Sequence, residues 1–161
     1  MLAVYVTIIA IILLQLTHVL SYSIIKGRIL RQQTWDLNIC CGKTDGGGIN
    51  ADIVAHSKLP MMVLVDIHHL PFRDGQFNTV LCSHTMEHVA HPDKFFRELS
   101  RVGDDVTIVI PPLWDVSAAL NVFEHRWIFL SFKKTHKSLP PYVELPLASA
   151  VQRYLGQRIH A

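Results

Sequence analysis

The first 25 residues carry no charged side chain, and this feature most limits what the N-terminus can become. Residues 2–20 alone supply a helix of the length that crosses a bilayer, which needs about 20 apolar residues. The apolar side chains surround the whole helix, which disfavours a core helix with one buried stripe. No basic residue precedes the run and no small-residue cleavage site follows it, which disfavours a signal peptide. The sequence therefore predicts a transmembrane anchor over residues 1–25.

Basic residues follow this run at Lys26, Arg28 and Arg31, and none precedes it. The positive-inside rule then predicts a single-pass membrane protein whose C-terminal domain is cytoplasmic, joined by a basic linker over residues 26–35. Beyond residue 35 the chain has 12 Lys and Arg against 13 Asp and Glu, a net charge of −1. This balance gives nucleic-acid binding no electrostatic support, so we expect no nucleic-acid partner.

Cysteine usage fits a reducing compartment. The chain has three cysteines, of which Cys40 and Cys41 are adjacent, and it has no CxxC pair. This number and spacing make neither a disulfide framework nor a cysteine zinc site. We therefore expect free thiols and no bound metal.

Short apolar runs alternate with turns and with one well-delimited helix. Strands are predicted at 37–41, 49–53, 61–67, 77–83 and 105–112, and a helix is predicted from Pro92 to its stop at Gly103. A weaker pattern predicts a helix at 116–122, a strand at 125–132 and a helix at 147–155. The alternation indicates a doubly wound, mostly parallel α/β sheet over residues 36–124, followed by a C-terminal extension over 125–161. Lys133, Lys134 and Lys137 in that extension are expected to face solvent.

Polar residues stand at the ends of several predicted strands. Asp52, Asp66 and the pair Ser83-His84 each close an apolar run, and a glycine-bearing turn follows the first strand. Ligands of doubly wound sheets bind beyond the carboxyl ends of the strands, where backbone N–H groups of a glycine turn can approach them. The order of these residues along one sheet predicts a nucleotide-type site.

The segment "LNICCGK…INADI…VDIHHLPFRDGQFNTVLCSHTMEHVAHPDKFFRELSRVGDDVTIVIPP" resembles class I S-adenosylmethionine-dependent methyltransferases. It is most similar to the subgroup with the pattern D-x-x-x-LPF-x-D-x-x-F-D-x-V-x-x-x-x-x-LEH-V-x-x-P, followed by R-E-x-x-RV. The resemblance implies S-adenosylmethionine as cofactor. It implies that Gly42 and its neighbours Asn38, Cys40 and Lys43 contact the methionine part of the cofactor. It also implies that Asp52 binds the ribose and that Asp66 and Ile67 lie on either side of the adenine. Ser83 and His84 would lie beneath the methyl group.

The chain departs from the family pattern in three ways. Asn38 and Cys40 stand where the family usually has an acid and a glycine, and Asn78 replaces a common Asp. The gap from Gly42 to Asp52 is too short for the usual helix, so the turn at 46–48 is expected to replace it. Five strands are evident where a full domain of this class has seven. The expected fold is therefore a compact, truncated Rossmann-like sheet behind an N-terminal transmembrane helix. A homo- or hetero-oligomeric partner would complete the short C-terminal lobe.

Methyl transfer from a sulfonium is an in-line displacement in which positioning supplies much of the rate. We expect an oxygen or nitrogen nucleophile to approach residues 83–88, with His84, Glu87 and His88 as the catalytic set and either histidine as general base. The asparagine-proline-proline motif used for exocyclic amines is absent, which disfavours nucleobase and amide nitrogens. A small-molecule, lipid-linked or envelope-glycan acceptor suits a membrane-anchored enzyme.

Two other functions fit the same residues. A tethered binding or scaffold module would keep the fold without catalysis, with Asn38 and Cys40 marking a lost cofactor site. The letters "HTMEH" also match the H-x-x-E-H motif of zinc hydrolases, in which His84 and His88 would bind zinc, Glu87 would be the base and Glu124 a third ligand. That motif requires a helix carrying both histidines.

Overall fold

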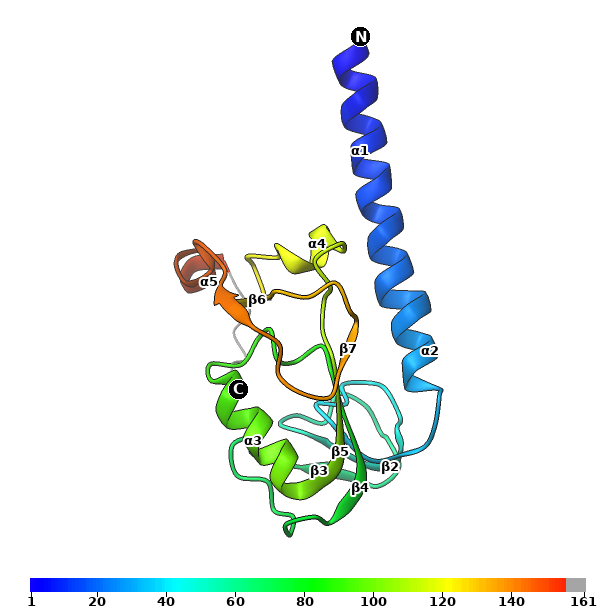
Figure 1. The fold of residues 1–161 in the computed structure, drawn as a ribbon, viewed down its shortest axis with the longest axis vertical. Helices are drawn as coiled ribbons and strands as arrows, with labels where there is room; N and C mark the ends of the chain where they lie inside the picture. Colours follow the sequence, from blue (N-terminus) through cyan, green and yellow to red (C-terminus); the bar gives the residue numbers. More distant parts are fainter. Residues whose placement is uncertain (156–161) are drawn as a thin grey trace.

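A computed structural model describes residues 1–155 and contains one central six-stranded sheet of order β3-β2-β1-β4-β5-β7 (Figure 1). Its strands are β1 (Trp35–Ile39), β2 (Gly47–Asp52), β3 (Met62–Leu64), β4 (Phe77–Ser83), β5 (Gly103–Val109) and β7 (Thr135–His136). The first five are parallel, and β7 pairs antiparallel with β5. A separate antiparallel pair joins β6 (Trp127–Phe129) to β8 (Tyr142–Glu144). The predicted mostly parallel α/β sheet is confirmed.

The strand order reverses direction between β1 and β4. From β1 the chain moves outward to β2 and β3, and then returns to place β4 and β5 on the other side of β1. Such a reversal opens a crevice beyond the carboxyl ends of the two central strands, which is where doubly wound sheets bind ligands. In this chain those ends are Ile39 and Ser83.

One face of the sheet is covered by α3 (Pro92–Val102). Its buried residues Phe95, Leu99 and Val102 pack into the main core. Proline at the helix start needs no hydrogen-bond donor there. The helix ends at Gly103, where a β-carbon would lie 2.2 Å from Val80 Cγ2, so only glycine lets the chain turn so closely onto β4. The predicted helix and its stop are confirmed.

The opposite face is covered by the end of the N-terminal helix. Its three parts, α1 (Leu2–Val19), the π-helical η1 (Leu20–Ile25) and α2 (Lys26–Leu30), run without a break. Ile29 of α2 forms a small core with Trp35, Leu81 and Val109. The segment predicted as a linker over residues 26–35 is thus helical as far as Leu30. Because a helical end can bury apolar side chains, it closes the sheet face that α3 leaves uncovered.

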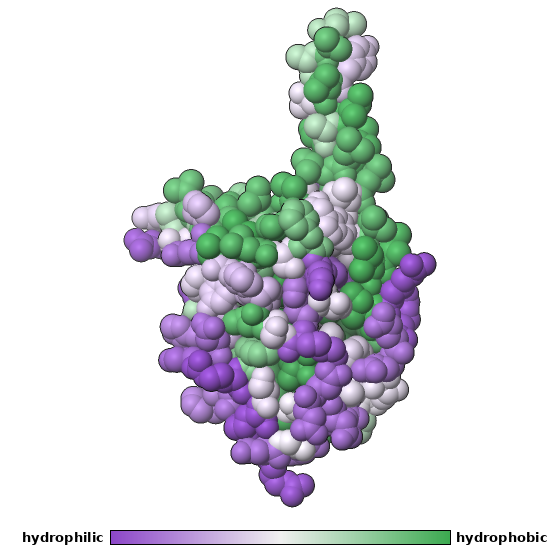
Figure 2. Space-filling model, viewed as in Figure 1, coloured by the Kyte–Doolittle hydropathy of each residue, from purple (hydrophilic) through white to green (hydrophobic). Residues whose placement is uncertain are grey.

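The beginning of the same helix projects away from the domain (Figure 1). The helix Leu2–Leu30 is long and apolar enough to cross a membrane, although a soluble core helix or a signal sequence would satisfy the same test of length and composition. Figure 2 shows hydrophobic surface on this helix and on the adjoining side of the domain, over α4 (Val116–Ala119) and α5 (Ala148–Leu155). We call the exposed apolar side chains of that side the apolar rim: Val116, Leu120, Phe123, Leu147 and Leu155.

Several predicted boundaries differ from the observed ones. The first strand starts two residues earlier than predicted and ends at Ile39, and β3 stops at Leu64 rather than at residue 67. The fifth strand ends before Pro111 and Pro112, which lack the N–H group of a strand ladder. The helix predicted at 116–122 is only four residues long. Part of the expected C-terminal extension, β7, joins the central sheet at its edge.

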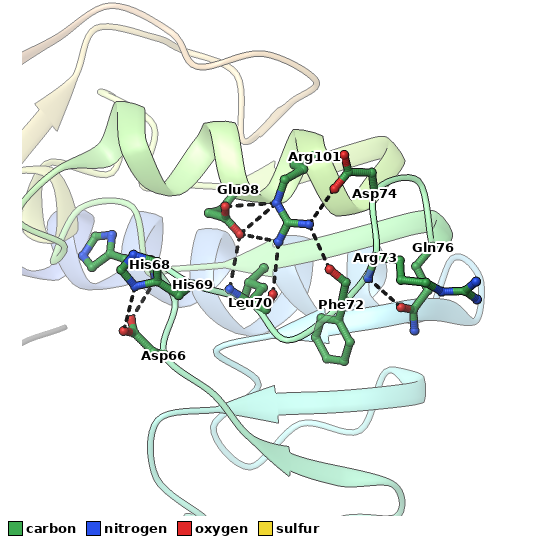
Figure 3. A network of polar contacts seen from close by, with 10 residues as sticks. All are labelled: Asp66, His68, His69, Leu70, Phe72, Arg73, Asp74, Gln76, Glu98 and Arg101. Atoms are coloured by element: carbon green, nitrogen blue, oxygen red, sulfur yellow. Dashed lines mark hydrogen bonds and ion pairs between the residues drawn. The ribbon is translucent and has the colours of Figure 1, made fainter.

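A polar network attaches the loop between β3 and β4 to α3 (Figure 3). The Arg101 guanidinium donates to the carbonyl oxygens of Leu70 (3.0 Å) and Phe72 (2.8 Å), and to the carboxylates of Asp74 (2.8 Å) and Glu98 (2.7 Å). The network joins the LPF-x-D and R-E-x-x-RV segments of the sequence. These two motifs therefore have a structural task, which is to fix the loop that carries Asp66.

Candidate functional site

The turn over residues 40–46 connects the parallel strands β1 and β2 without a helix. The buried Asn38 amide donates to the Thr44 carbonyl oxygen (2.8 Å) and to Asn50 Oδ1 (3.1 Å). The Gly46 N–H donates to the same Asn50 oxygen (2.9 Å). Asn38 therefore stabilises the turn through two donated hydrogen bonds. A carboxylate in its place would have no hydrogen to donate to either oxygen.

Glycine and a strained cysteine shape the upper part of this turn. Cys40 and Gly42 adopt φ angles of 52° and 57°, in the left-handed region that disfavours a β-carbon. A β-carbon on Gly42 would meet no atom within 4 Å, so the backbone there faces open space. Residues 46–48 were predicted to form the turn, but Gly47 and Gly48 already belong to β2. Gly48 is needed because a β-carbon would lie 2.4 Å from the Trp35 carbonyl oxygen.

A cavity of about 320 Å³ lies at the reversal point of the sheet. It joins the end of β1 and its turn to the end of β4, and α2 and η1 close its far side. Five of the residues expected to bind a cofactor line it, and so does the expected catalytic residue His84: Asn38, Cys40, Gly42, Lys43, Ser83 and His84. The size falls within the usual range of ligand pockets, which begins near 300 Å³.

The other three expected cofactor residues lie outside the lining of this cavity. Asp52 closes β2, is 6% exposed, and accepts hydrogen bonds from the N–H groups of Gly42 (2.8 Å) and Ile53 (2.7 Å). Asp66 is exposed and pairs with His69 (3.2 Å). The backbone N–H of His68 lowers the pKa of Asp66, with a smaller effect from His69. The Ile67 side chain is buried in the main core.

His84 and Glu87 form a buried dyad at the edge of the cavity. His84 Nδ1 lies 3.0 Å from Glu87 Oε1, and His84 has a φ of 55°. Burial lowers the pKa of His84, and the bond to Glu87 opposes this only in part. Burial raises the pKa of Glu87, but the hydrogen bond and charge of His84, with the nearby imidazoles, lower it to about 2. The pair therefore combines a carboxylate with an imidazole.

Residues 84–88 form a turn, in which the His88 N–H donates to the Thr85 carbonyl oxygen (2.9 Å). His84 and His88 consequently do not stand on one face of a helix, as the H-x-x-E-H zinc motif requires. His88 is half-buried, and its Nδ1 lies 2.9 Å from the Glu124 carbonyl oxygen. This arrangement argues against the zinc hydrolase that the letters suggest.

A second cavity, of about 430 Å³, lies on the other side of His84 between the N-terminal helix and α4. Tyr22 and His84 border both cavities, and their rings meet edge to face at 5.2 Å. The helix contributes His18, whose Nδ1 lies 3.2 Å from the buried Asp115 carboxylate. These helix residues, with Lys26 in the first cavity, were missed by the sequence reasoning because they lie in segments predicted as anchor and linker.

The C-terminal segment also contributes a residue that was expected to face solvent. Lys134 is buried and donates to Ser21 Oγ of η1 (2.8 Å). Burial lowers the pKa of Lys134 to about 8, against a smaller opposing effect of Asp115. This contact holds the helix against the domain beside the second cavity.

The cysteines at the site are not activated nucleophiles. Burial raises the pKa of Cys40 well above its usual value, with a further increase from Cys82. Burial likewise raises the pKa of Cys41 to about 11, and Asp52 adds to this effect. A thiol attacks as thiolate, so neither is suited to nucleophilic chemistry near neutral pH.

One family model matches part of the chain. Residues 49–105 match the family model described as a methyltransferase domain. That segment runs from β2 into β5 and includes the Arg101 network and the His84–Glu87 dyad. It begins after the turn over residues 40–46, so the match does not depend on that turn. No curated protein matches the chain.

Three solved structures are similar to parts of the chain. The YcgJ protein from Bacillus subtilis is 16% identical with a TM-score of 0.42, and the match covers 53% of this chain and 50% of that one. A SAM-dependent methyltransferase from Aquifex aeolicus is 15% identical with a TM-score of 0.42, over 56% and 65%. A SAM-dependent methyltransferase from Methanosarcina mazei is 14% identical with a TM-score of 0.42, over 74% and 78%. The chain thus spans half to two thirds of the length of the first two.

Proposed function

We propose that this chain, whose residues 49–105 match a family model described as a methyltransferase domain, is a class I S-adenosylmethionine-dependent methyltransferase that transfers a methyl group to an oxygen or nitrogen of an acceptor at a membrane surface. The observation that carries the proposal is the cavity at the reversal point between β1 and β4. It lies where a doubly wound sheet binds its ligand, and His84 separates it from a second cavity.

The residues around the first cavity fit the cofactor. Gly42 exposes its backbone to open space, so a ligand can approach it without meeting a side chain. Lys26 and Lys43 line the same cavity and can pair with the carboxylate of a methionine group. When bound, S-adenosylmethionine supplies a methyl group activated by a positively charged sulfur. The residues that would surround its methionine part are Asn38, Cys40, Gly42, Lys43 and Ser83. As the family resemblance implies, we assign the ribose contact to Asp52 and the adenine contacts to Asp66 and Ile67.

The second cavity is the proposed acceptor site, and the His84–Glu87 dyad is its proposed base. With the Nδ1–H of His84 donated to Glu87, Nε2 keeps a lone pair, and it is buried with no hydrogen-bond partner among residues 1–155. An acceptor hydroxyl placed against Nε2 would give up its proton to His84 as the oxygen attacks. Glu87 would orient the imidazole and stabilise its positive charge. His88 is held by the Glu124 carbonyl and takes a supporting position.

The location of this cavity supports a lipid-linked acceptor. Its walls include Gln15, His18 and Tyr22 of the apolar N-terminal helix, as well as residues of α4. The apolar rim adjoins the same side of the domain (Figure 2). A helix that enters a bilayer beside this rim would bring the opening of the cavity to the lipid headgroups, where an acceptor with a lipid tail can enter without leaving the membrane.

Calorimetric titration of the detergent-solubilised full chain with S-adenosylhomocysteine tests the cofactor site. We expect micromolar binding, weakened at least tenfold by Gly42→Leu. The matched control is Gly75→Leu, because Gly75 has nearly the same φ angle, 59°, but lies outside the cavity. Both variants incur similar backbone strain, so a difference between them reports on the cavity. Absence of binding at millimolar ligand would refute the proposal.

The acceptor is tested by adding methyl-labelled S-adenosylmethionine to membranes that contain the chain. A lipid-linked acceptor predicts label in the organic extract, which His84→Ala abolishes and His56→Ala, at an exposed histidine, does not. Label confined to the aqueous extract would contradict a lipid-linked acceptor while leaving methyl transfer intact.

A non-catalytic binding module is the second candidate function. It is favoured by Asn38, whose amide hydrogens are used within the turn, and by the strained Cys40 at a position where the family has glycine. Titration separates the two candidates, because a module that has lost its cofactor site binds no S-adenosylhomocysteine.

A further inference from the structure

Three potential metal-binding side chains meet beside the second cavity. Glu87 and His88 lie in the turn after β4, and His125 lies just before β6. One ligand atom from each lies within 4.8 Å of the other two. The two segments are joined by backbone bonds, since the N–H groups of Arg126 (2.7 Å) and Trp127 (3.3 Å) both donate to the Glu87 carbonyl oxygen. The cluster therefore depends on the folded chain and not on a local sequence motif.

Two of these side chains are buried with unused polar atoms. Glu87 is 0% and His125 is 5% exposed. Glu87 Oε2 and His125 Nδ1 have no hydrogen-bond partner within the described residues 1–155. A buried polar atom left unpaired costs about 1–3 kcal/mol, and more if it is charged. Two such atoms in one cluster indicate that a ligand other than the protein satisfies them.

The remaining contacts hold the side chains as metal ligands are usually held. His88 Nδ1 donates to the Glu124 carbonyl oxygen (2.9 Å), which leaves the lone pair on Nε2. His84 Nδ1 is hydrogen-bonded to Glu87 Oε1, so Glu87 Oε2 remains available to an ion. Metal-binding histidines almost always donate their second ring N–H to a carbonyl or carboxylate, and metal-binding carboxylates are themselves hydrogen-bonded. The cluster shows both features.

We propose that Glu87, His88 and His125 bind one divalent first-row transition-metal ion. Two imidazoles with one carboxylate suit zinc, iron or manganese, whereas Mg²⁺ and Ca²⁺ prefer a shell of oxygens. Zinc ligands at about 2.1 Å in a tetrahedral arrangement lie about 3.5 Å apart. The cluster thus has to contract by at most about 1.3 Å to close on an ion. His84 supports the site through Glu87 and does not ligate the ion, unlike in the H-x-x-E-H motif.

The ion would keep a position for a further ligand. Three protein ligands leave at least one site open, as in catalytic zinc centres. His125 also lines the second cavity, so an acceptor oxygen in that cavity can complete the shell. This role in acceptor binding rests on the proposed function, whereas metal binding by the three side chains does not.

Metal binding is tested on the untagged full chain in detergent, freed of metal by chelation and then dialysed against Zn²⁺, Mn²⁺ or Mg²⁺ alone. We expect one zinc or manganese ion per chain and no stoichiometric magnesium. The isosteric Glu87→Gln and the variant His125→Ala should each weaken binding at least 100-fold, while His56→Ala, at an exposed histidine, should leave it unchanged. Thermal unfolding should shift upward with metal in the wild type and in His56→Ala only.

Co²⁺ provides a readout that needs no variant. Its visible absorption reports nitrogen and oxygen ligands in a low-coordinate site, and we expect the bands to appear with one equivalent and disappear with zinc. The proposal is overturned if Zn²⁺, Mn²⁺ and Co²⁺ all fail to bind stoichiometrically at 100-fold excess over the protein. It is also overturned if His56→Ala loses as much metal binding as the Glu87 and His125 variants. The titrations contain no cofactor, so their result is independent of S-adenosylhomocysteine binding.

Discussion

Asn38 has opposite meanings in the sequence and in the folded chain. In the sequence it replaces the family's acid and suggests a lost charge. In the structure its amide hydrogens bind Thr44 and Asn50 oxygens, and so hold the turn that forms one wall of the first cavity. Cys40, the other departure, takes a left-handed conformation that glycine would adopt without strain. Both departures therefore belong to the seven-residue turn that connects β1 to β2 in place of a crossover helix.

Replacing Asn38 with the acid of the family pattern should destabilise the folded chain for this reason. We expect Asn38→Asp to lower the free energy of unfolding by about 2–4 kcal/mol, because a buried carboxylate would face two acceptor oxygens without a hydrogen to donate. Asn78→Asp, also toward the family residue but at an exposed position, should change it by less than about 0.5 kcal/mol. Denaturant unfolding of both variants measures the difference. Equal stability of the two variants would show that the Asn38 bonds are unimportant.

At the scale of elements, α3 does more than cover the sheet. Through Arg101 it fixes the loop between β3 and β4, which presents Asp66 and leads into the strand that ends at Ser83 (Figure 3). The guanidinium reaches two carbonyls and two carboxylates at once because its donors form a planar fork. A motif that looks like a signature of function in the sequence is in this chain a structural clamp.

Arg101→Lys should therefore not behave as a conservative change. A lysine ammonium cannot reach both loop carbonyls and Glu98 together, so we expect a loss of about 1–3 kcal/mol in unfolding free energy. Arg97→Lys on the exposed part of the same helix should be neutral within about 0.5 kcal/mol. Hydrogen exchange of residues 70–76 should also accelerate in Arg101→Lys alone. Unchanged exchange there would argue against the clamp.

At the scale of the whole molecule, the two halves of the N-terminal helix have different surroundings. Its first half projects from the domain, and its second half supplies Tyr22 and Lys26 to the cavities and Ile29 to the core. Ser21 and His18 fix it to Lys134 and Asp115. A membrane anchor held to the domain by these contacts would give the domain one orientation toward the bilayer, with the apolar rim at its surface.

Membrane anchoring should depend on the projecting half. We expect the full chain to remain in membranes through alkaline carbonate extraction, and Ile8→Arg with Ile12→Arg to release it, since each arginine near the bilayer centre costs about 2.5–3.5 kcal/mol. Leu120→Arg with Phe123→Arg, in the apolar rim, should leave it bound. Protease added outside sealed cells should spare the domain if it is cytoplasmic. Release of the wild-type chain by carbonate would refute the anchor.

The sequence by itself was sufficient for the class of fold, the fourth strand and the α3 helix, because these depend on local periodicity and on helix punctuation. The match to a methyltransferase domain over residues 49–105 agrees with the contiguous pattern from Asp66 to Val102. The sequence also predicted that Asn38, Cys40, Gly42, Lys43 and Ser83 meet at one edge of the sheet, and these five residues line the first cavity. Its errors were in strand limits and in the turn after the first strand, where tertiary bonds of Asn38 and the close approach of Gly48 decide the path.

Only the tertiary structure decided what the N-terminal helix contributes and which histidines lie together. Tyr22 and Lys26 lie far in sequence from His84 and Lys43, and no local pattern records that they share a cavity. Backbone bonds from Arg126 and Trp127 to the Glu87 carbonyl oxygen bring His125 beside Glu87 and His88 across almost 40 residues, a proximity that the spacing within "HTMEH" does not show. Long-range packing determines these sites because each is formed by segments that meet only when the sheet is complete.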